Sequence, residues 1–343
     1  MTRALARPLV RWVPGVLLAL AALGAPPAGS AQQTHVLLVV GIGGDPRYTE
    51  RFHEWALKLR EGLLGRSGLS PDNVIYLAEK PDPANGARGP SSRENVDAAL
   101  QELAGRVGAD DKVLVVLIGH GTSREDGAVL NLPGRRDLGA DELALLLEAF
   151  PTQQVAVVNA ASASGPFVPA LSGPRRTVIT ATRTGMERNE TRFGQFFADA
   201  FAGEGADLDK DGAVSLFEAY EYTRREVVRH YQEQGLLLTE HSVLDADGDG
   251  QGTSEPAADS EESRLARAFR LGGRSAAADR TDVTDPVLRR LLDERAALAT
   301  RLEGLRGKRE SMDAEAYDRE LEALLVELAL KDRQIREAEG AAR

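Results

Sequence analysis

The sequence of 343 residues contains no cysteine. This absence excludes disulfide bonds, a thiolate nucleophile, cysteine-ligated zinc, iron–sulfur ligation and an acylated lipoprotein cysteine. Aromatic residues make up only 5% of the chain, and they form no stripe with basic residues. The formal net charge of −11 repels phosphate backbones. We therefore expect no nucleic-acid partner.

Long hydrophobic runs are also missing, apart from one short apolar stretch at residues 16–23. This stretch follows three arginines and precedes a small-residue segment. That order is typical of a secretory signal peptide, predicted here over residues 1–31 with cleavage before Gln32. The stretch is short for a spanning helix, so we expect no membrane span after cleavage. The mature protein is expected to be exported, to the periplasm or the cell exterior, and an uncleaved membrane anchor is the alternative.

Residues 32–190 alternate short aliphatic runs with amphipathic stretches, the pattern of a parallel β-sheet covered by helices on both faces. The expected strands are His35–Val40, Asn73–Leu77, Lys112–Ile118, Gln154–Asn159 and Thr177–Thr182. The expected helices are Tyr48–Leu64, Ser92–Val107 and Asp141–Phe150. In folds of this α/β class, ligands and chemistry gather where strands end and helices begin.

The common nucleotide-binding and hydrolase signatures are absent from these strand ends. Gly41 and Gly43 begin a dinucleotide-binding fingerprint, but Pro46 occupies the position of its third glycine. The sequence has neither a P-loop nor a GxSxG nucleophile elbow. A nucleotide cofactor is therefore not expected.

Two later strand ends carry side chains suited to acyl transfer. The strand ending at Ile118 is followed by Gly-His120-Gly121, and the next strand is followed by Ala-Ala-Ser162-Ala-Ser-Gly. A histidine at such an edge can act as a general base, because its ordinary pKa lies near neutrality. A neighbouring backbone N–H can stabilise an oxyanion.

These two endings resemble those of the legumain and caspase-like cysteine peptidases, in which one strand ends in His-Gly and the next leads into Cys-x-Ser-Gly. The resemblance covers roughly residues 34–189 and implies a caspase-like three-layer sandwich that meets a polypeptide substrate or a protein partner. The family's histidine falls on His120 and its oxyanion-hole glycine on Gly121. Its cysteine falls on Ser162.

A hydroxyl in place of the thiol leaves two hypotheses about function. The first is a degenerate peptidase kept as a binding module, with Ser162 as a small residue that closes a turn. The second is an active hydrolase in which Ser162 attacks an amide or ester, His120 takes its proton and the N–H of Gly121 steadies the oxyanion. The missing thiol favours the first, because serine needs a well-placed base for every attack.

Two further segments, 125–136 and 182–189, are expected to border the same edge of the sheet. Arg183 or Arg188 in the second of them can pair with an acidic group of a substrate, or remain solvated like most exposed arginines.

A different motif lies beyond the sheet domain, in residues 191–256. Residues 207–218 match the twelve-residue EF-hand loop, whose oxygen atoms wrap a calcium ion. Zinc would prefer nitrogen or sulfur ligands, and magnesium suits such a ligand-rich loop less well. Without a cation the carboxylates would repel one another. The predicted ligands are Asp207, Asp209, Asp211, Ala213 through its carbonyl, Ser215 directly or through water, and Glu218.

A second loop of this kind begins at Asp245. Its first half follows the motif, but position 8 is glycine and position 12 is Pro256, with glutamate one place early. We therefore predict a calcium loop of non-standard closure, and expect it to pair with the first loop as EF-hands generally do. Its predicted ligands are Asp245, Asp247, Asp249, Gln251 and Glu255.

The remaining sequence is expected to have a structural role. Residues 257–283 are predicted as a linker with a short helix around Leu265–Phe269, and residues 284–343 as a helical hairpin or coiled coil. Asp285 and a following proline mark the start of its first helix. Leucines then recur at heptad spacing, interrupted by Arg295. This hairpin is expected to pack on itself, on a partner such as a second copy, or on the main domain.

Overall fold

The computed structural model describes residues 32–125, 127–272, 285–306 and 312–341. The predicted signal peptide and residues 273–284 of the predicted linker lie outside the described residues. Within the described ranges, no helix combines the length and the apolarity that crossing a membrane requires.

The main body is built on a seven-stranded sheet with the order β11-β9-β8-β4-β1-β2-β3. All neighbouring strands are parallel except β11, which runs antiparallel to β9. The strands are β1 (Thr34–Val40), β2 (Val74–Ala78), β3 (Gly89–Pro90), β4 (Lys112–Ile118), β8 (Gln154–Asn159), β9 (Arg176–Thr180) and β11 (Val243–Asp245).

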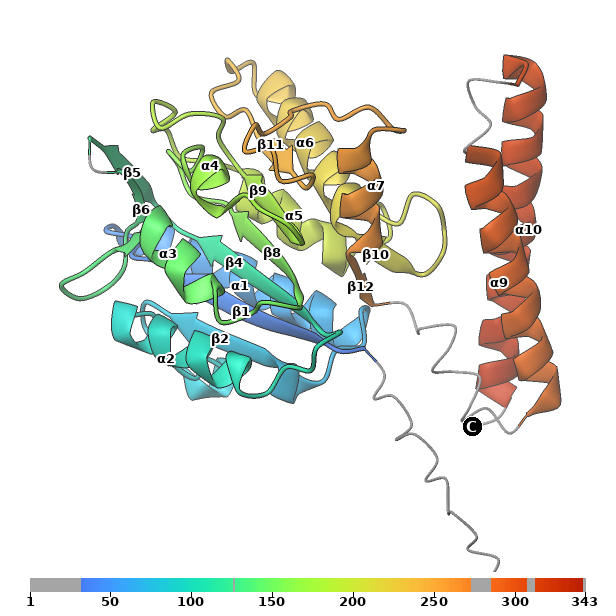
Figure 1. Ribbon diagram of the computed structural model, residues 1–343, viewed down its shortest axis with the longest axis horizontal. Coiled ribbons are helices and arrows are strands. Elements are labelled where there is room, and N and C mark those ends of the chain that lie inside the picture. Colours follow the sequence, from blue (N-terminus) through green and yellow to red (C-terminus); the bar gives the residue numbers. More distant parts are fainter. Residues whose placement is uncertain (1–31, 126, 273–284, 307–311, 342–343) are drawn as a thin grey trace, which may run out of the picture. The chain divides into compact units, whose positions relative to one another are not determined.

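Helices cover both faces of this sheet (Figure 1). One apolar cluster joins alternate residues of β1 to the helices α1, α5 and α6, and the other joins the intervening β1 residues to α2, α3 and α4. The predicted fold class, a parallel sheet between two helical layers, is thereby confirmed. The helices are α1 (Pro46–Gly65), α2 (Arg93–Ala104), α3 (Ala140–Leu147), α4 (Phe167–Leu171), α5 (Phe193–Ala202) and α6 (Leu216–Glu233), with short 3₁₀ turns at Pro71–Asn73 and Pro83–Asn85.

A small antiparallel sheet follows His120 and differs from the sequence expectation. It contains β5 (Gly121–Arg124), β6 (Gly127–Leu130) and β7 (Leu138–Gly139). The segment 125–136, among whose residues no strand was expected, therefore includes β6, whose alternate residues Ala128 and Leu130 are buried. Four residues give too short an alternation for the pattern to stand out in the sequence.

The segment after α6 is more ordered than a linker. It contains α7 (Glu261–Ala268) and β12 (Arg270–Gly272), which pairs antiparallel with β10 (Ala213–Ser215). The side chain of Ser260 accepts the N–H of Ser263 at 3.2 Å and so caps α7. Ala266 and Leu271 are fully buried. The linker prediction for residues 257–272 is corrected, because both elements pack into the main core.

The C-terminal hairpin consists of α9 (Pro286–Arg306) and α10 (Ala314–Ala341). Asp285 caps α9 by accepting the N–H of Val287 at 2.7 Å, as the sequence predicts. Two apolar clusters, one of which includes Leu302 and Leu328, join the helices and confirm that the hairpin packs on itself. Arg295, which interrupts the heptad pattern, bonds to Asp332 on the opposite helix at 2.6 Å.

Candidate functional site

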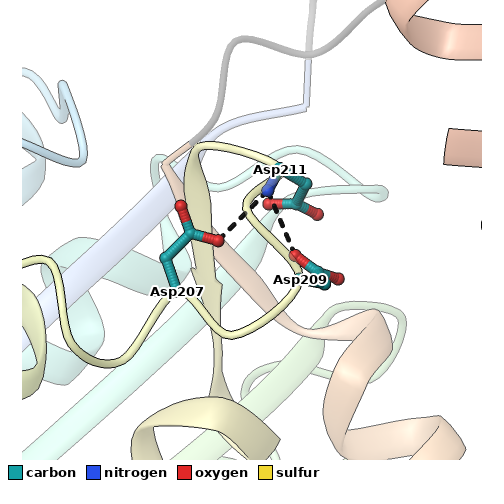
Figure 2. Close-up of side chains that lie close together, drawn as sticks. All are labelled: Asp207, Asp209 and Asp211. Carbon is teal, nitrogen blue, oxygen red and sulfur yellow. Dashed lines mark hydrogen bonds between the residues drawn. The ribbon is translucent and has the colours of Figure 1, made fainter. Parts of the chain in front are cut away.

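The first candidate site is the loop between α5 and α6, where three carboxylates gather (Figure 2). Oxygen atoms of Asp207, Asp209 and Asp211 lie within 4.8 Å of one another. The backbone N–H of Asp211 donates to Asp207 at 3.1 Å and to Asp209 at 3.2 Å. Lys210 and Gly212 adopt φ values of +57° and +84°, so the chain turns tightly around the carboxylates. Glycine takes such values at little cost.

Glu218 closes this loop from the first turn of α6. One carboxylate oxygen accepts the N–H groups of Leu208 and Asp209, at 3.0 and 3.3 Å. The other accepts the N–H and the hydroxyl of Ser215, at 2.9 and 2.8 Å. Positions 1, 3 and 5 of the predicted loop therefore share one centre, and Glu218 at position 12 closes the loop through its bonds to Leu208, Asp209 and Ser215 at position 9. Ala213, at position 7, donates its N–H to Asp211 at 2.8 Å.

The electrostatics of the first loop fit a hard dication. Burial, and then the charge of Asp209, raises the pKa of both Asp207 and Glu218 above the ordinary carboxyl range. Arg270 forms an ion pair with Asp211. The donor set consists of oxygen atoms only, which suits calcium. A bound calcium ion would supply the positive charge that these buried carboxylates favour.

The second candidate loop starts at the end of β11. Asp245 is fully buried, and its carboxylate accepts the N–H groups of Gly248 and Gly250 at 3.0 and 2.9 Å. The carboxylate of Asp247 accepts the N–H of Asp249 at 3.2 Å. The carboxylate of Asp249 in turn accepts the N–H of Gln251 at 2.7 Å. The first half of the loop therefore has the turn that the motif predicts.

The closing carboxylate of the second loop is Glu262, which the sequence did not indicate. Oxygen atoms of Asp245, Asp247 and Glu262 lie within 4.8 Å of one another. Burial raises the pKa of Glu262 to about 7. Glu255, the predicted closing residue, is instead 76% exposed at its side chain and pairs with Arg224 at 2.8 Å. Glu262 lies in the first turn of α7, beyond the twelve-residue window, so motif spacing gave no signal for it.

The two loops do not pair with each other, contrary to the sequence expectation. β10 of the first loop pairs with β12, whereas β11 at the start of the second joins the main sheet beside β9. The second loop instead folds back on its own strand, because Leu244 and Thr253 exchange N–H···O bonds of 2.9 and 2.7 Å. Glycine at position 8 permits this fold, since a Cβ on Gly252 would meet Val243 at 2.6 Å.

The predicted catalytic residues meet at the carboxyl edge of the sheet. β4 and β8 are parallel neighbours with Leu117 opposite Asn159. His120 and Ser162 each follow these partners by three positions, which brings the two turns side by side. The contact is tight, because a Cβ on Gly121 would meet the carbonyl oxygen of Ser162 at 2.2 Å.

The hydroxyl of Ser162 is engaged by backbone groups. Its side-chain oxygen accepts the N–H of Gly121 and faces the carbonyl oxygen of Gly121, to which it donates, both at 3.3 Å. The residue is only 3% exposed. Among the hydrogen bonds of the described residues, none joins this hydroxyl to the imidazole of His120. Ala163, which follows, adopts a left-handed φ of +52°.

The imidazole of His120 lies against two neighbouring aromatic rings of α1. Its centroid is 4.7 Å from that of Tyr48 and 5.0 Å from that of Phe52, both in edge-on geometry. Burial lowers the pKa of His120, and the charge of Glu190 and a backbone hydrogen bond with Gly43 oppose that shift. The net effect favours a neutral imidazole, which is the form a general base requires.

The two predicted flanking arginines lie on a loop that contacts this edge. The backbone carbonyl of Glu187 accepts the N–H of Ala163 at 2.8 Å, which joins the 183–188 loop to the residue after Ser162. Arg183 donates to the hydroxyl of Ser254 at 2.7 Å, so its guanidinium is already bound within the chain. Arg188 is exposed.

Two caspases are among the solved structures to which this chain is similar. The chain is similar to the Drosophila initiator caspase Dronc, with 11% sequence identity and a TM-score of 0.40, over 62% of this chain and 78% of that chain. It is also similar to drICE, with 11% identity and a TM-score of 0.37, over 59% of this chain and 85% of that chain. No protein-family model matches the sequence. No curated protein matches it either.

Proposed function

We propose that this chain is an exported calcium-binding protein whose α/β domain is a degenerate peptidase that serves as a binding module. The observation that carries the proposal is the hydroxyl of Ser162, which is buried and bonds to Gly121 rather than to His120. A serine attacks only when a base removes its proton. Here the proton is directed to a backbone carbonyl.

A second candidate function, an active serine-type hydrolase, is favoured by one observation at the same edge. Burial keeps the imidazole of His120 neutral and therefore able to accept a proton. In this candidate the hydroxyl of Ser162 would have to leave the carbonyl of Gly121 and bond to the imidazole of His120. The two candidates thus differ in the partner of one side chain.

Calcium binding is supported by the oxygen-only donor sets of the two loops. Asp207 and Glu218 in the first loop are buried, as are Asp245 and Glu262 in the second. Burial raises the pKa of all four carboxyl groups, and the charge of Asp209 adds to this shift in the first pair, as the charge of Asp247 does in the second. A cation at each loop would offset this repulsion.

We expect titration calorimetry on residues 32–343 to find two calcium ions per chain. The variants Asp209→Asn and Asp247→Asn change the same position of the two loops, so each is expected to remove or weaken one of the two binding steps. The reason is that each substitution removes one anionic oxygen ligand. A titration without binding heat, repeated by calcium-sensitive fluorescence with the same result, would refute the calcium proposal.

The absence of cysteine makes Ser162→Cys a selective reporter of this edge. In that variant position 162 carries the only thiol, and its rate of alkylation by iodoacetamide against pH gives the thiol pKa. We expect a pKa above the ordinary value of about 8.5, because burial disfavours the thiolate. The further change His120→Ala should leave it unaltered.

The active-hydrolase candidate predicts the opposite behaviour. A thiol paired with the imidazole of His120 would have a pKa below about 7.5, and His120→Ala would raise it. A fluorophosphonate probe supplies the second test, with and without calcium. Labelling of the unmodified protein that disappears in Ser162→Ala would overturn the binding-module proposal.

A further inference from the structure

The loop of residues 183–188 is the part of the structure that connects Ser162 to the second calcium loop. On one side the loop adjoins the turn after Ser162, through the bond from the N–H of Ala163 to the carbonyl of Glu187. The approach at Gly165 is equally close, since a Cβ there would meet the carbonyl oxygen of Arg183 at 2.2 Å. A shift of the 183–188 loop therefore cannot leave the Ser162 turn unchanged.

The carboxylate of Glu187 holds this loop from within. One oxygen accepts the N–H groups of Arg183 and Thr184, both at 3.2 Å. The other oxygen accepts the N–H of His241 at 2.8 Å and lies 3.2 Å from its Nδ1. A single side chain thus ties the 183–188 loop to the residue that leads into β11.

A second contact joins the 183–188 loop to the C-terminal end of the second calcium loop. Arg183 donates to the hydroxyl of Ser254 at 2.7 Å. His241 lies before Asp245 in sequence and Ser254 lies near the end of the predicted loop. The 183–188 loop therefore contacts both flanks of the second calcium loop.

The two flanks behave as one unit, because they bond to each other and to one buried residue. Leu244 and Thr253 exchange the two backbone bonds already described. The hydroxyl of Tyr220, a fully buried residue of α6, lies 2.9 Å from the carbonyl oxygen of Ser242 and 2.8 Å from that of Ser254. Any change in the spacing of the Asp245 and Asp247 carboxylates is thus passed to both contacts with the 183–188 loop.

The first calcium loop lacks such a connection. Among the hydrogen bonds of the described residues, none joins residues 207–218 to residues 183–188. Its strand β10 pairs instead with β12, through Ser215 opposite Arg270. Its routes to the 183–188 loop are indirect: one runs along α6 through Tyr220, and the other from β12 through α7 and Glu262 to the second loop.

We propose that calcium at the second loop, and not at the first, sets the order of the 183–188 loop and hence the binding properties of the edge at Ser162. The inference rests on the proposed calcium binding. Calcium would draw the carboxylates of the second loop together, which favours the closed arrangement of residues 241–255. That arrangement presents His241 and Ser254 to Glu187 and Arg183. Two sites linked by one ordered element are coupled in both directions.

Hydrogen exchange measured by mass spectrometry tests the coupling in the mature chain, with calcium chloride as the probe ligand. The reporters are the amides of Ala163, Arg183 and Thr184, each bonded to Glu187. We expect calcium to slow their exchange by about fivefold or more, the lower end of usual coupling between sites. Asp209→Asn should retain this slowing, whereas Asp247→Asn should lose it.

A third variant separates calcium binding from its transmission. Ser254→Ala removes the acceptor of Arg183 and no predicted calcium ligand. It is expected to bind two calcium ions and to show at least a twofold smaller slowing at Arg183 and Thr184, within the usual range of local coupling effects.

The failure of the coupling is distinguishable from the failure of the proposed function. If calorimetry shows two bound ions while calcium leaves the three reporter amides unchanged, the coupling is wrong and calcium binding stands. Equal loss of slowing in Asp209→Asn and Asp247→Asn would also overturn it, because the effect would then be global. If no calcium binds, both proposals fall together.

Discussion

Glu218→Gln is expected to weaken calcium binding at the first loop by about 100-fold, equivalent to about 2.7 kcal/mol. Glutamine keeps one carbonyl oxygen but loses the charge and the second acceptor oxygen. The structure shows both carboxylate oxygens of Glu218 in use, one toward Leu208 and Asp209 and one toward Ser215. The number of charged oxygen ligands is a main determinant of affinity in such loops. Titration calorimetry measures the change.

The matched control for this substitution is Glu233→Gln. Glu233 ends the same helix α6, and its carboxylate is exposed and 3.6 Å from Arg229. We expect its calcium affinity to stay within about twofold of the unmodified chain, since exposed ion pairs contribute little. A Glu218→Gln protein that binds two ions with unchanged affinity would show that the first loop is not a calcium site.

The position of the candidate catalytic edge follows from the sequence because local apolar runs mark where each strand ends. The runs Lys112–Ile118 and Gln154–Asn159 match β4 and β8, and apolar residues on both faces make them central strands. Parallel neighbours in register then place His120 and Ser162 together. The sequence did not reveal the rotamer of Ser162, because its choice between Gly121 and His120 depends on packing that no motif records.

The partners of the two candidate calcium loops were not predictable for a different physical reason. Spacing motifs describe ligands that are close in sequence, whereas Glu262 reaches the second loop from a separate helix. The glycine at position 8 departs from the EF-hand motif and by itself indicates no contact partner. In the structure this glycine lets the chain approach Val243, which is a contact between residues nine positions apart. Strand β12 was missed similarly, since three residues carry no periodic signal.

Glu240 is a buried carboxyl group that no sequence motif indicated. Its residue is 3% exposed, and its two oxygens accept the N–H groups of Arg192 and Phe193 at 2.7 and 3.1 Å. It therefore caps the start of α5, whose own N-cap residue provides no side-chain bond. Burial outweighs these hydrogen bonds and raises the pKa of Glu240 to about 7. The native protein thus holds a proton on Glu240 at a pH where the unfolded chain has lost it.

This difference gives the stability a pH dependence of defined sign. Between the unfolded pKa of 4.5 and the native value of about 7, only the folded chain retains the proton on Glu240. Glu240 therefore contributes most to the free energy of unfolding below pH 4.5. This contribution falls by about 3 kcal/mol as the pH rises from 4.5 to 7. Above pH 7 its contribution is constant.

We expect Glu240→Gln to remove this dependence. Urea unfolding at pH 5 and pH 8, compared between the variant and the unmodified chain, isolates Glu240 because all other titrating groups are shared. At pH 5 the variant should be less stable by about 1 kcal/mol, since an amide offers one acceptor oxygen to two N–H groups. At pH 8 the order should reverse, because glutamine carries no buried charge. Glu204→Gln, whose side chain is 89% exposed, is the control and should shift neither value. A difference between Glu240→Gln and the unmodified chain that is equal at both pH values would show that Glu240 titrates alike in the folded and unfolded states.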